Sequence, residues 1–393
     1  MDYDDFNDDE KDIVAAVRRF VEGRVRPAVM QHERDRAYPA ALVAEMKEMG
    51  LYGLAVPQEF GGLGLRVPVF TAVMEVLAGG WSTLSAYVNS HATVAYAIAA
   101  HGTEDQKARY LPAMARGEHR GALCLTEPHC GSDLQAVRTT ATPVGNGFRV
   151  RGTKIFVTNG GTATLLLVLC RDPQGGEGAR PGFSLLLVEK GFDGVEVTSV
   201  FHKMGFELVD TVQIELGDVP VPAANVLSGA SGRGFPQLMD ALECGRIAVA
   251  ISAVGVAADA LSIARRYAAE RETFGVTIDK HQAIQMKLAD AAAKLMAARL
   301  MTMEAARAKE RGERADMRGA MAKMYASERA LEICHVAMQI MGGAGYTRDW
   351  PLERLTREAT LYVTGEGTND INRLVIARRL RDDGEAESIG LHT

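Results

Sequence analysis

The chain has 393 residues, of which 47% are hydrophobic, so it can bury a large core and form two or three lobes of about 100 to 200 residues each. The 44 Lys and Arg against 50 Asp and Glu give a net charge of −6 and are spread along the chain, which argues against a nucleic-acid surface. The acidic start MDYDDFNDDEKD is unlike a basic leader, and we see no apolar run of about 18 residues, so we expect a cytoplasmic protein without membrane insertion.

The first 230 residues contain two regions with different predicted secondary structure. From about Asp8 to Met114 the alternating charged and apolar positions predict helices, and Gly50 is expected to stop the helix of AALVAEMKEMG. From about Gly121 to Ser228 the chain reads as short strands separated by Gly and Pro turns: FRVRG, KIFVT, LLLVL, FSLLLVEK and VQIEL.

Long Ala-rich and Met-rich segments after Gly234 predict three amphipathic helices that form a bundle. The methionines from Met286 through Met303 are expected to pack in its core. We therefore predict a mostly helical fold with a central β domain: residues 1–120 helical, 121–230 β, and 231–393 a helical bundle.

Several kinds of site are disfavoured by spacing. The glycine-rich points complete no G-x-G-x-x-G, which argues against a Rossmann fold, and G-x-S-x-G is absent. Five scattered cysteines without a C-x-x-C pair, together with lone histidines, predict neither a disulfide framework nor a metal site.

Two segments combine residues that can bind a ligand or do chemistry. TEPHCGSD, from Thr126 to Asp133, can present hydroxyl and backbone donors to the polar edge of a ligand, and the simpler interpretation is an ordinary Asx-rich connection. GEGTND places Glu366 between two glycines before an amphipathic helix. An apolar setting there would raise its pKa towards the range of a general base, whereas the simpler interpretation is a loop acid at a helix start.

Five segments then occur in a fixed order: LCLTEPHCGSD, KIFVTNGG, RETFG followed by HQAIQ, QIMGGAGY and EGTNDINRLVIAR. Together they resemble the acyl-CoA dehydrogenase family along nearly the whole chain. The resemblance implies an N-terminal helical domain, a middle β-barrel-like domain and a C-terminal four-helix bundle, which agrees with the predicted order. It also implies FAD as the cofactor and an acyl-CoA as the substrate.

The resemblance implies which positions hold FAD. One set would surround the flavin ring, with a threonine hydroxyl able to bond flavin N5: Leu125, Thr126, Phe156, Val157 and Thr158. A second set would hold the ADP half across a subunit interface: Arg271, Thr273, Phe274, Gln282, Gln339 and Gly343. Thr368 and Asp370 match positions that touch FAD. A shared site implies a homodimer as the minimal unit, and a homotetramer made of two dimers is usual in the family.

Glu366 matches the family's catalytic glutamate, and the implied mechanism follows from that. The thioester carbonyl accepts hydrogen bonds from the Glu366 backbone N–H and a flavin ribityl hydroxyl. Glu366 takes the α-proton while hydride leaves the β-carbon for flavin N5. The product is a trans-2-enoyl thioester, and an electron-transferring flavoprotein receives the electrons. Substrate-side positions implied by the resemblance are Ser132, Glu243, Arg246 and Gly365.

Two departures from the family's pattern bear on the site. Gly365 stands where many members carry a tyrosine, so the acyl pocket is expected to differ in shape. Some members place the base instead on the long helix beside the arginine that corresponds to Arg246, but here that neighbour is Gly245. The assignment of the base to Glu366 is strengthened.

Other functions stay open at this point. A flavoenzyme of the same fold could act as an oxidase, as an enoyl-thioester reductase, or on an acyl group bound to a carrier protein. A non-catalytic helical binding protein that has kept the fold is an alternative of another class.

Overall fold

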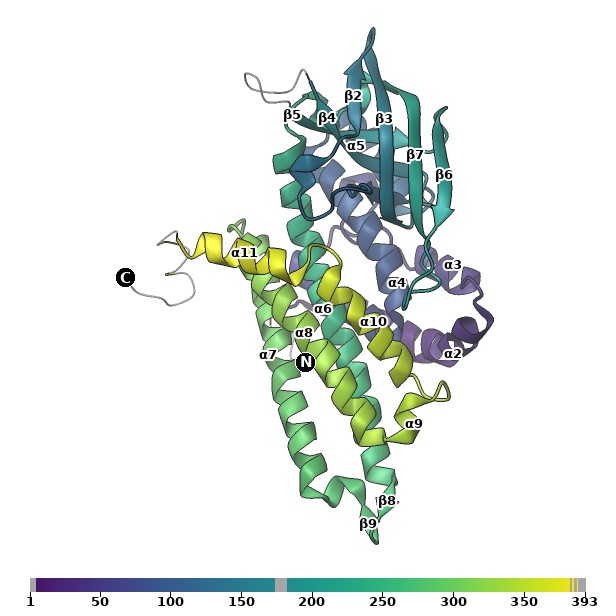
Figure 1. Cartoon of the computed structure of the whole chain (residues 1–393), viewed down its shortest axis with the longest axis vertical. Coiled ribbons are helices and arrows are strands. Elements are labelled where there is room, and N and C mark those ends of the chain that lie inside the picture. Colours follow the sequence, from purple (N-terminus) through teal and green to yellow (C-terminus); the bar gives the residue numbers. More distant parts are fainter. Residues whose placement is uncertain (1–4, 174–181, 382–383, 385–386, 388–393) are drawn as a thin grey trace.

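The computed structural model describes residues 5–173, 182–381, 384 and 387, and its elements form three consecutive blocks (Figure 1). The first block is helical, the second is a sheet, and the third is again helical. The predicted order and the mostly helical fold class are therefore confirmed.

The first block comprises α1 (Asp8–Phe20), a π-helical turn (Val21–Val25), α2 (Arg26–Asp35), α3 (Ala40–Glu48), α4 (Val67–His101) and α5 (Glu104–Ala115). Capping boxes fix two of the starts, because the side chains of Asn7 and Thr103 each accept a hydrogen bond from a backbone N–H of the first turn. α3 ends at Glu48, and Gly50 follows with φ +72°, as expected of a helix stop.

The β block contains seven strands in one sheet of order β1-β4-β2-β3-β7-β6, with β5 paired to β4. These strands are β1 (Gly121–Cys124), β2 (Thr140–Pro143), β3 (Gly147–Thr158), β4 (Leu165–Asp172), β5 (Gly182–Glu189), β6 (Val195–Val200) and β7 (Thr211–Pro222). The prediction of separate strands for FRVRG and KIFVT was wrong. They form the single strand β3, because bulges near Gly152 and Ile155 bend it without breaking its pairing with β7.

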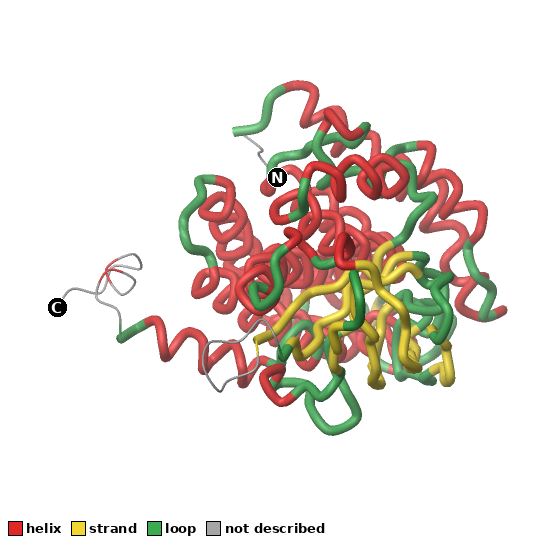
Figure 2. The backbone as a smooth tube through the Cα atoms, turned by 90° about the horizontal axis from the view of Figure 1, so that it is seen from above, coloured by secondary structure: helices red, strands yellow, loops and turns green. Residues whose placement is uncertain are grey.

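Both faces of the sheet are covered near β4, which explains its continuous apolar run. Leu165, Leu167 and Leu169 pack with α4, α5 and the start of the next long helix, whereas Leu166 and Val168 face the interior of the β block. Figure 2 shows the sheet on one side of the molecule and most of the helices on the other side. The β block is therefore joined to the helical part through a shared apolar core.

The third block comprises α6 (Gly234–Glu270), the hairpin β8 (Glu272–Thr273) and β9 (Val276–Thr277), α7 (Gln282–Glu310), α8 (Asp316–Met341), α9 (Gly343–Tyr346), α10 (Leu352–Thr364) and α11 (Asn369–Arg379). α8 packs against α6, α7, α10 and α11. α10 thus adds a fourth helix to the three predicted, which matches the four-helix bundle implied by the family resemblance.

Two helices contradict the expectation that no apolar stretch is long enough to span a membrane. α4 and α6 each contain an 18-residue window that passes by length and hydropathy, but 83% of each window is buried inside the protein. The two helices pack along each other at the centre of the molecule (Figure 1). Their hydropathy is therefore explained as that of core helices.

The methionine stripe of α7 also differs from its prediction. Met303 is buried, but Met286 and Met296 are 63% and 53% exposed, and Leu300 on the same helix is 55% exposed. These apolar residues lie on the surface of this chain rather than in its core. These three side chains of α7 are therefore left exposed in the single chain.

Candidate active site

The end of β3 meets the loop after β1 where the sheet faces α4. The backbone N–H of Ile155 donates to Thr126 O at 2.9 Å, and Lys154 Nζ donates to Leu125 O at 3.0 Å. On the other side, Ser90 Oγ of α4 lies 3.4 Å from Thr158 O. The structure therefore brings together the predicted flavin-ring positions of two distant segments, and α4 lies beside them.

Phe156 offers a flat apolar surface at this place. Its side chain is 58% exposed, its φ is +54°, and its ring lies 4.8 Å from that of Phe201. The Val157 side chain, in contrast, is 1% exposed and packs inside the β block. Only the backbone of Val157 can face a bound ring, because strand alternation turns its side chain inwards.

A buried ion pair that sequence reasoning missed supports this loop. Lys154 is fully buried and its Nζ lies 2.8 Å from Glu127 Oε1, which also accepts from the Thr139 hydroxyl at 2.6 Å. Glu127, His129 and Cys130 form one group among the described residues whose ligand atoms lie within 4.8 Å of one another. Lys154 already pairs with the Glu127 carboxylate, and the predicted absence of a metal stays a prediction.

Glu366 lies on the short turn between α10 and α11. Gly365 ends α10, Glu366 has φ +56°, Gly367 has φ +83°, and Thr368 caps α11 by accepting from a backbone N–H at 3.3 Å. A side-chain-bearing residue in the left-handed region is strained, and such residues concentrate at functional sites. The turn therefore holds Glu366 in a conformation that its own preference does not favour.

The Glu366 side chain is half-buried and points at α6 and α4. A Cβ atom placed on Gly245 would lie 2.4 Å from Glu366 Oε1 and 3.5 Å from Thr93 Oγ1. Thr93 is one turn along α4 from Ser90, a rise of about 4.5 Å, and Ser90 contacts Thr158. The carboxylate and the flavin-ring positions thus lie near neighbouring turns of α4.

Burial and charge act in opposite directions on this carboxylate. Burial raises the pKa of Glu366 above its usual range, while the cations Arg246 on α6 and Lys323 on α8 hold it down. Arg246 is buried, its Nε has no hydrogen-bond partner among the described residues, and burial lowers its pKa. A buried guanidinium with an unpaired Nε suits an anionic or strongly polar ligand.

The remaining predicted site residues differ from one another in exposure and in charge pairing. Glu243 is already bound by Lys309, whose Nζ lies 2.8 Å from Oε2, so a ligand would meet a neutralised pair. Ser132 is exposed on the loop after β1, and the Asp370 side chain is 91% exposed beside Arg373. Lys309 was missed because it comes from the far end of α7 and no spacing in the sequence points to it.

The second set of predicted cofactor positions lies at the opposite end of the bundle (Figure 1). Arg271 and Phe274 belong to the exposed hairpin after α6, and Phe274 is 97% exposed with φ +52°. Gln339 lies 16 residues beyond Lys323 on α8, which is about 24 Å along the helix. The same end also holds Thr273, Gln282 and Gly343. One chain therefore does not bring the two predicted sets together.

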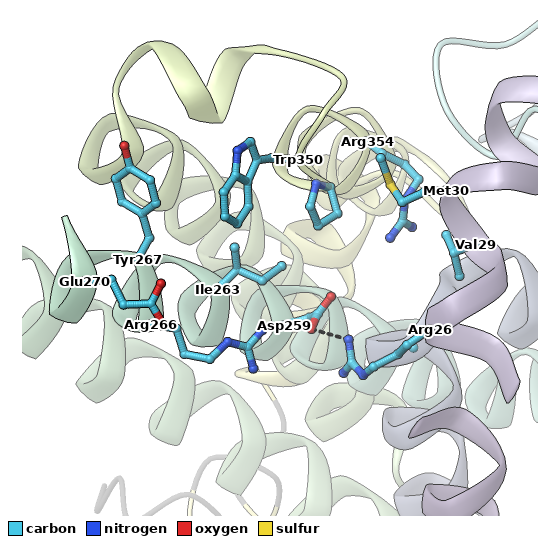
Figure 3. Close-up of a pocket in the computed structure, with 12 residues that line it drawn as sticks. Arg26, Val29, Met30, Asp259, Ile263, Arg266, Tyr267, Glu270, Trp350 and Arg354 are labelled. Carbon is cyan, nitrogen blue, oxygen red and sulfur yellow. Dashed lines mark hydrogen bonds and ion pairs between the residues drawn. The ribbon is translucent and has the colours of Figure 1, made fainter. Parts of the chain in front are cut away.

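A separate cleft of about 330 Å³ lies between α2, α6 and the segment before α10 (Figure 3). Arg26 and Asp259 form an ion pair of 2.6 Å on one side, and Trp350 lies on the other. None of the predicted site residues lines it, so it is not the site of Glu366.

The fold and the geometry around Glu366 define a class of protein. A half-buried carboxylate with a raised pKa lies beside α6, and an exposed aromatic ring lies on the sheet that packs against α4, as expected of an oxidoreductase built around a flat redox cofactor. The comparisons agree, and the chain belongs to the acyl-CoA dehydrogenase family.

Sequence models of the three parts of that family match successive segments. They are described as the acyl-CoA dehydrogenase N-terminal domain (residues 7–118), middle domain (122–219) and C-terminal domain (232–381). The chain is 35% identical to the short-chain specific acyl-CoA dehydrogenase of Clostridium acetobutylicum over 93% of its length and 96% of that protein. It is 37% identical to the NADH-dependent acryloyl-CoA reductase of Anaerotignum propionicum, covering 92% of each.

A solved structure resembles the whole fold. A chain from a structure described as the electron transferring flavoprotein of Acidaminococcus fermentans superposes with a TM-score of 0.90 and 38% identity, over 98% of this chain and 100% of that one. The protein is thus an FAD-dependent oxidoreductase of this family. The residues fit the cofactor, because Phe156 leaves an exposed apolar ring on the strand whose backbone bonds the Thr126 carbonyl.

Proposed function

We propose that the protein removes two hydrogens from the α and β carbons of an acyl-CoA thioester to give the trans-2-enoyl-CoA, with Glu366 as the base. The observation that carries this proposal is the placement of the Glu366 carboxylate against Gly245 and beside α4, one helical turn from the contact with Thr158. A substrate between these two places would have its α-carbon at the carboxylate and its β-carbon towards the flavin-ring positions.

The chain's own residues supply proton transfer and orientation. Glu366 accepts the α-proton, and its raised pKa makes the carboxylate a better base at neutral pH than an exposed acid. The Glu366 backbone N–H donates to the thioester carbonyl and thereby stabilises the negative charge that develops on its oxygen. FAD, when bound, accepts the hydride that leaves the β-carbon.

The separation of the two predicted cofactor sets supports a shared site in a homo-oligomer. Since Arg271 and Phe274 lie at the far end of the bundle, they can reach an FAD held at Thr158 only in another copy of the chain. The exposed Met286 and Met296 on α7 offer an apolar face that a second copy would cover. We propose a homodimer as the minimal unit and a homotetramer as the assembly.

We also propose an electron acceptor and a cellular location for the protein. The similarity to a chain from an electron transferring flavoprotein structure supports such a flavoprotein as the acceptor. A cytoplasmic location stays a prediction from the sequence. Gly365 leaves the approach to Glu366 without a side chain, so we propose an acyl pocket that differs in shape from that of members with a tyrosine there.

An anaerobic titration tests the function. The purified FAD-loaded protein is mixed with short, medium, long and branched acyl-CoAs, and the oxidised-flavin absorbance is followed. We expect bleaching with at least one, and the ranking gives the substrate class. A yellow protein that no acyl-CoA bleaches contradicts the dehydrogenase half-reaction.

A reductase running the same site in reverse is the second candidate, favoured by the 37% identity to acryloyl-CoA reductase. In that case the chemically reduced protein is reoxidised faster by an enoyl-CoA than the oxidised protein is bleached by the corresponding acyl-CoA. The opposite ranking of the two rates supports the dehydrogenase.

A further inference from the structure

Lys323 on α8 is fully buried and faces the turn that carries Glu366. We propose that Lys323 is a positioning residue: its ammonium group holds the turn in the conformation that presents the Glu366 carboxylate to the substrate, and it keeps that carboxylate ionised. This inference rests on the proposed role of Glu366 as the base.

The ammonium group makes three contacts with the turn. Lys323 Nζ lies 2.8 Å from Gly367 O, 2.9 Å from Asn369 Oδ1 and 3.4 Å from Val363 O. A lysine ammonium has three N–H donors, and here all three have an acceptor. Because the acceptors lie on both sides of Glu366, the contacts fix the turn from α10 to α11 at its two ends.

The turn needs such a support because its backbone is strained. Glu366 has φ +56°, a conformation that persists in a residue with a side chain only where the surroundings impose it. Asn369 extends the support, since its Nδ2 donates to Ser327 Oγ at 3.0 Å on the same face of α8. Asn372 Nδ2 adds a hydrogen bond to Gly367 O at 3.2 Å.

The charge of Lys323 acts directly on the base. The charged groups that face Glu366 are Arg246 from α6 and Lys323 from α8, and both lower its pKa against the effect of burial. Burial lowers the pKa of Lys323 itself to about 8, while Glu366 and Glu328 favour its charged form over the effect of Arg246. The ammonium therefore persists at neutral pH. Removing its charge removes one lowering influence, so the pKa of Glu366 rises and the base is protonated over a wider pH range.

Variants at this position separate charge from shape. Lys323→Gln keeps N–H donors without the charge, Lys323→Met removes both, and Lys323→Arg keeps the charge. The limiting rate of flavin reduction by a saturating acyl-CoA is measured against pH for each. In Lys323→Gln we expect the acid limb of the profile to move to higher pH by about one unit. The plateau rate should fall about 10-fold to 100-fold, because the carboxylate is less well placed, with little change in substrate affinity.

Ser327→Ala is the matched control, because it loosens Asn369 from the same helix and leaves the charge in place. Its pH profile, and that of Lys323→Arg, should coincide with the wild type. Thermal unfolding of every variant separates general loss of stability from the shift of the profile. The proposal is overturned if Lys323→Gln and Lys323→Met keep the wild-type profile, or if Ser327→Ala moves it equally. Reduction of the wild-type protein by an acyl-CoA tests the proposed function independently of these variants.

Discussion

The two ends of the helical bundle differ in how completely a single chain builds them. At the end next to the sheet, Glu366 lies among buried cations, and the turn that carries it is fixed by hydrogen bonds. At the other end, Arg271 is exposed on a hairpin and Phe274 is 97% exposed. The comparison indicates that one chain positions the base unaided, whereas the proposed shared site would need another copy to complete the second set of cofactor positions.

The largest expected effect on the rate of flavin reduction comes from removing the base while the bundle end that carries Arg271 is left intact. Glu366→Gln should lower the limiting rate of flavin reduction by about 10²-fold to 10⁴-fold, because no other carboxylate is assigned to take the α-proton. The FAD content of the purified protein should be unchanged. Glu304→Gln, on an exposed carboxylate of α7, is the control. A Glu366→Gln protein that is reduced at the wild-type rate refutes the assignment of the base.

A smaller effect is expected from crowding the base without changing it. Gly245→Ala places a Cβ atom 2.4 Å from Glu366 Oε1, so the carboxylate must move away. A displacement of about 1 Å can cost about 10²-fold in rate, and we expect a loss of reduction rate up to that size. Gly319→Ala on α8 is the matched control, since its new methyl group would meet only Ile247 Cγ1 at 3.9 Å. Equal rates for both alanine variants would show that the carboxylate does not lie where the structure has it.

The sequence predicted the order of the blocks because periodicity and turn residues are local signals. It did not predict that FRVRG and KIFVT form one strand, since bulges depend on the pairing with β7. Nor did it predict that Met286 and Met296 lie on the surface, because an apolar helix face has the same pattern whether its partner is the same chain or another.

In the candidate site too, some residues could be predicted from the sequence and others could not. Glu366 was predicted from its flanking glycines together with the family resemblance. Its half-buried position beside Gly245 agrees with the predicted apolar setting of a base. Lys323, Lys154 and Lys309 were missed, since a lysine in a helix or strand usually lies in solvent. Only tertiary structure brings each of them to a carboxylate or carbonyl group.

The most direct test of a site shared between two chains is complementation. Glu366→Gln and Arg271→Ala proteins are each expected to be inactive or poorly loaded with FAD, and the two are co-expressed with different tags. In a mixed dimer with shared sites, one site carries both substitutions and the other carries neither. The account therefore predicts recovery to about a quarter of the wild-type activity, since about half of randomly paired dimers are mixed and half of their sites are intact. Activity no higher than the average of the two parents would contradict it, because both residues would then serve a site within one chain.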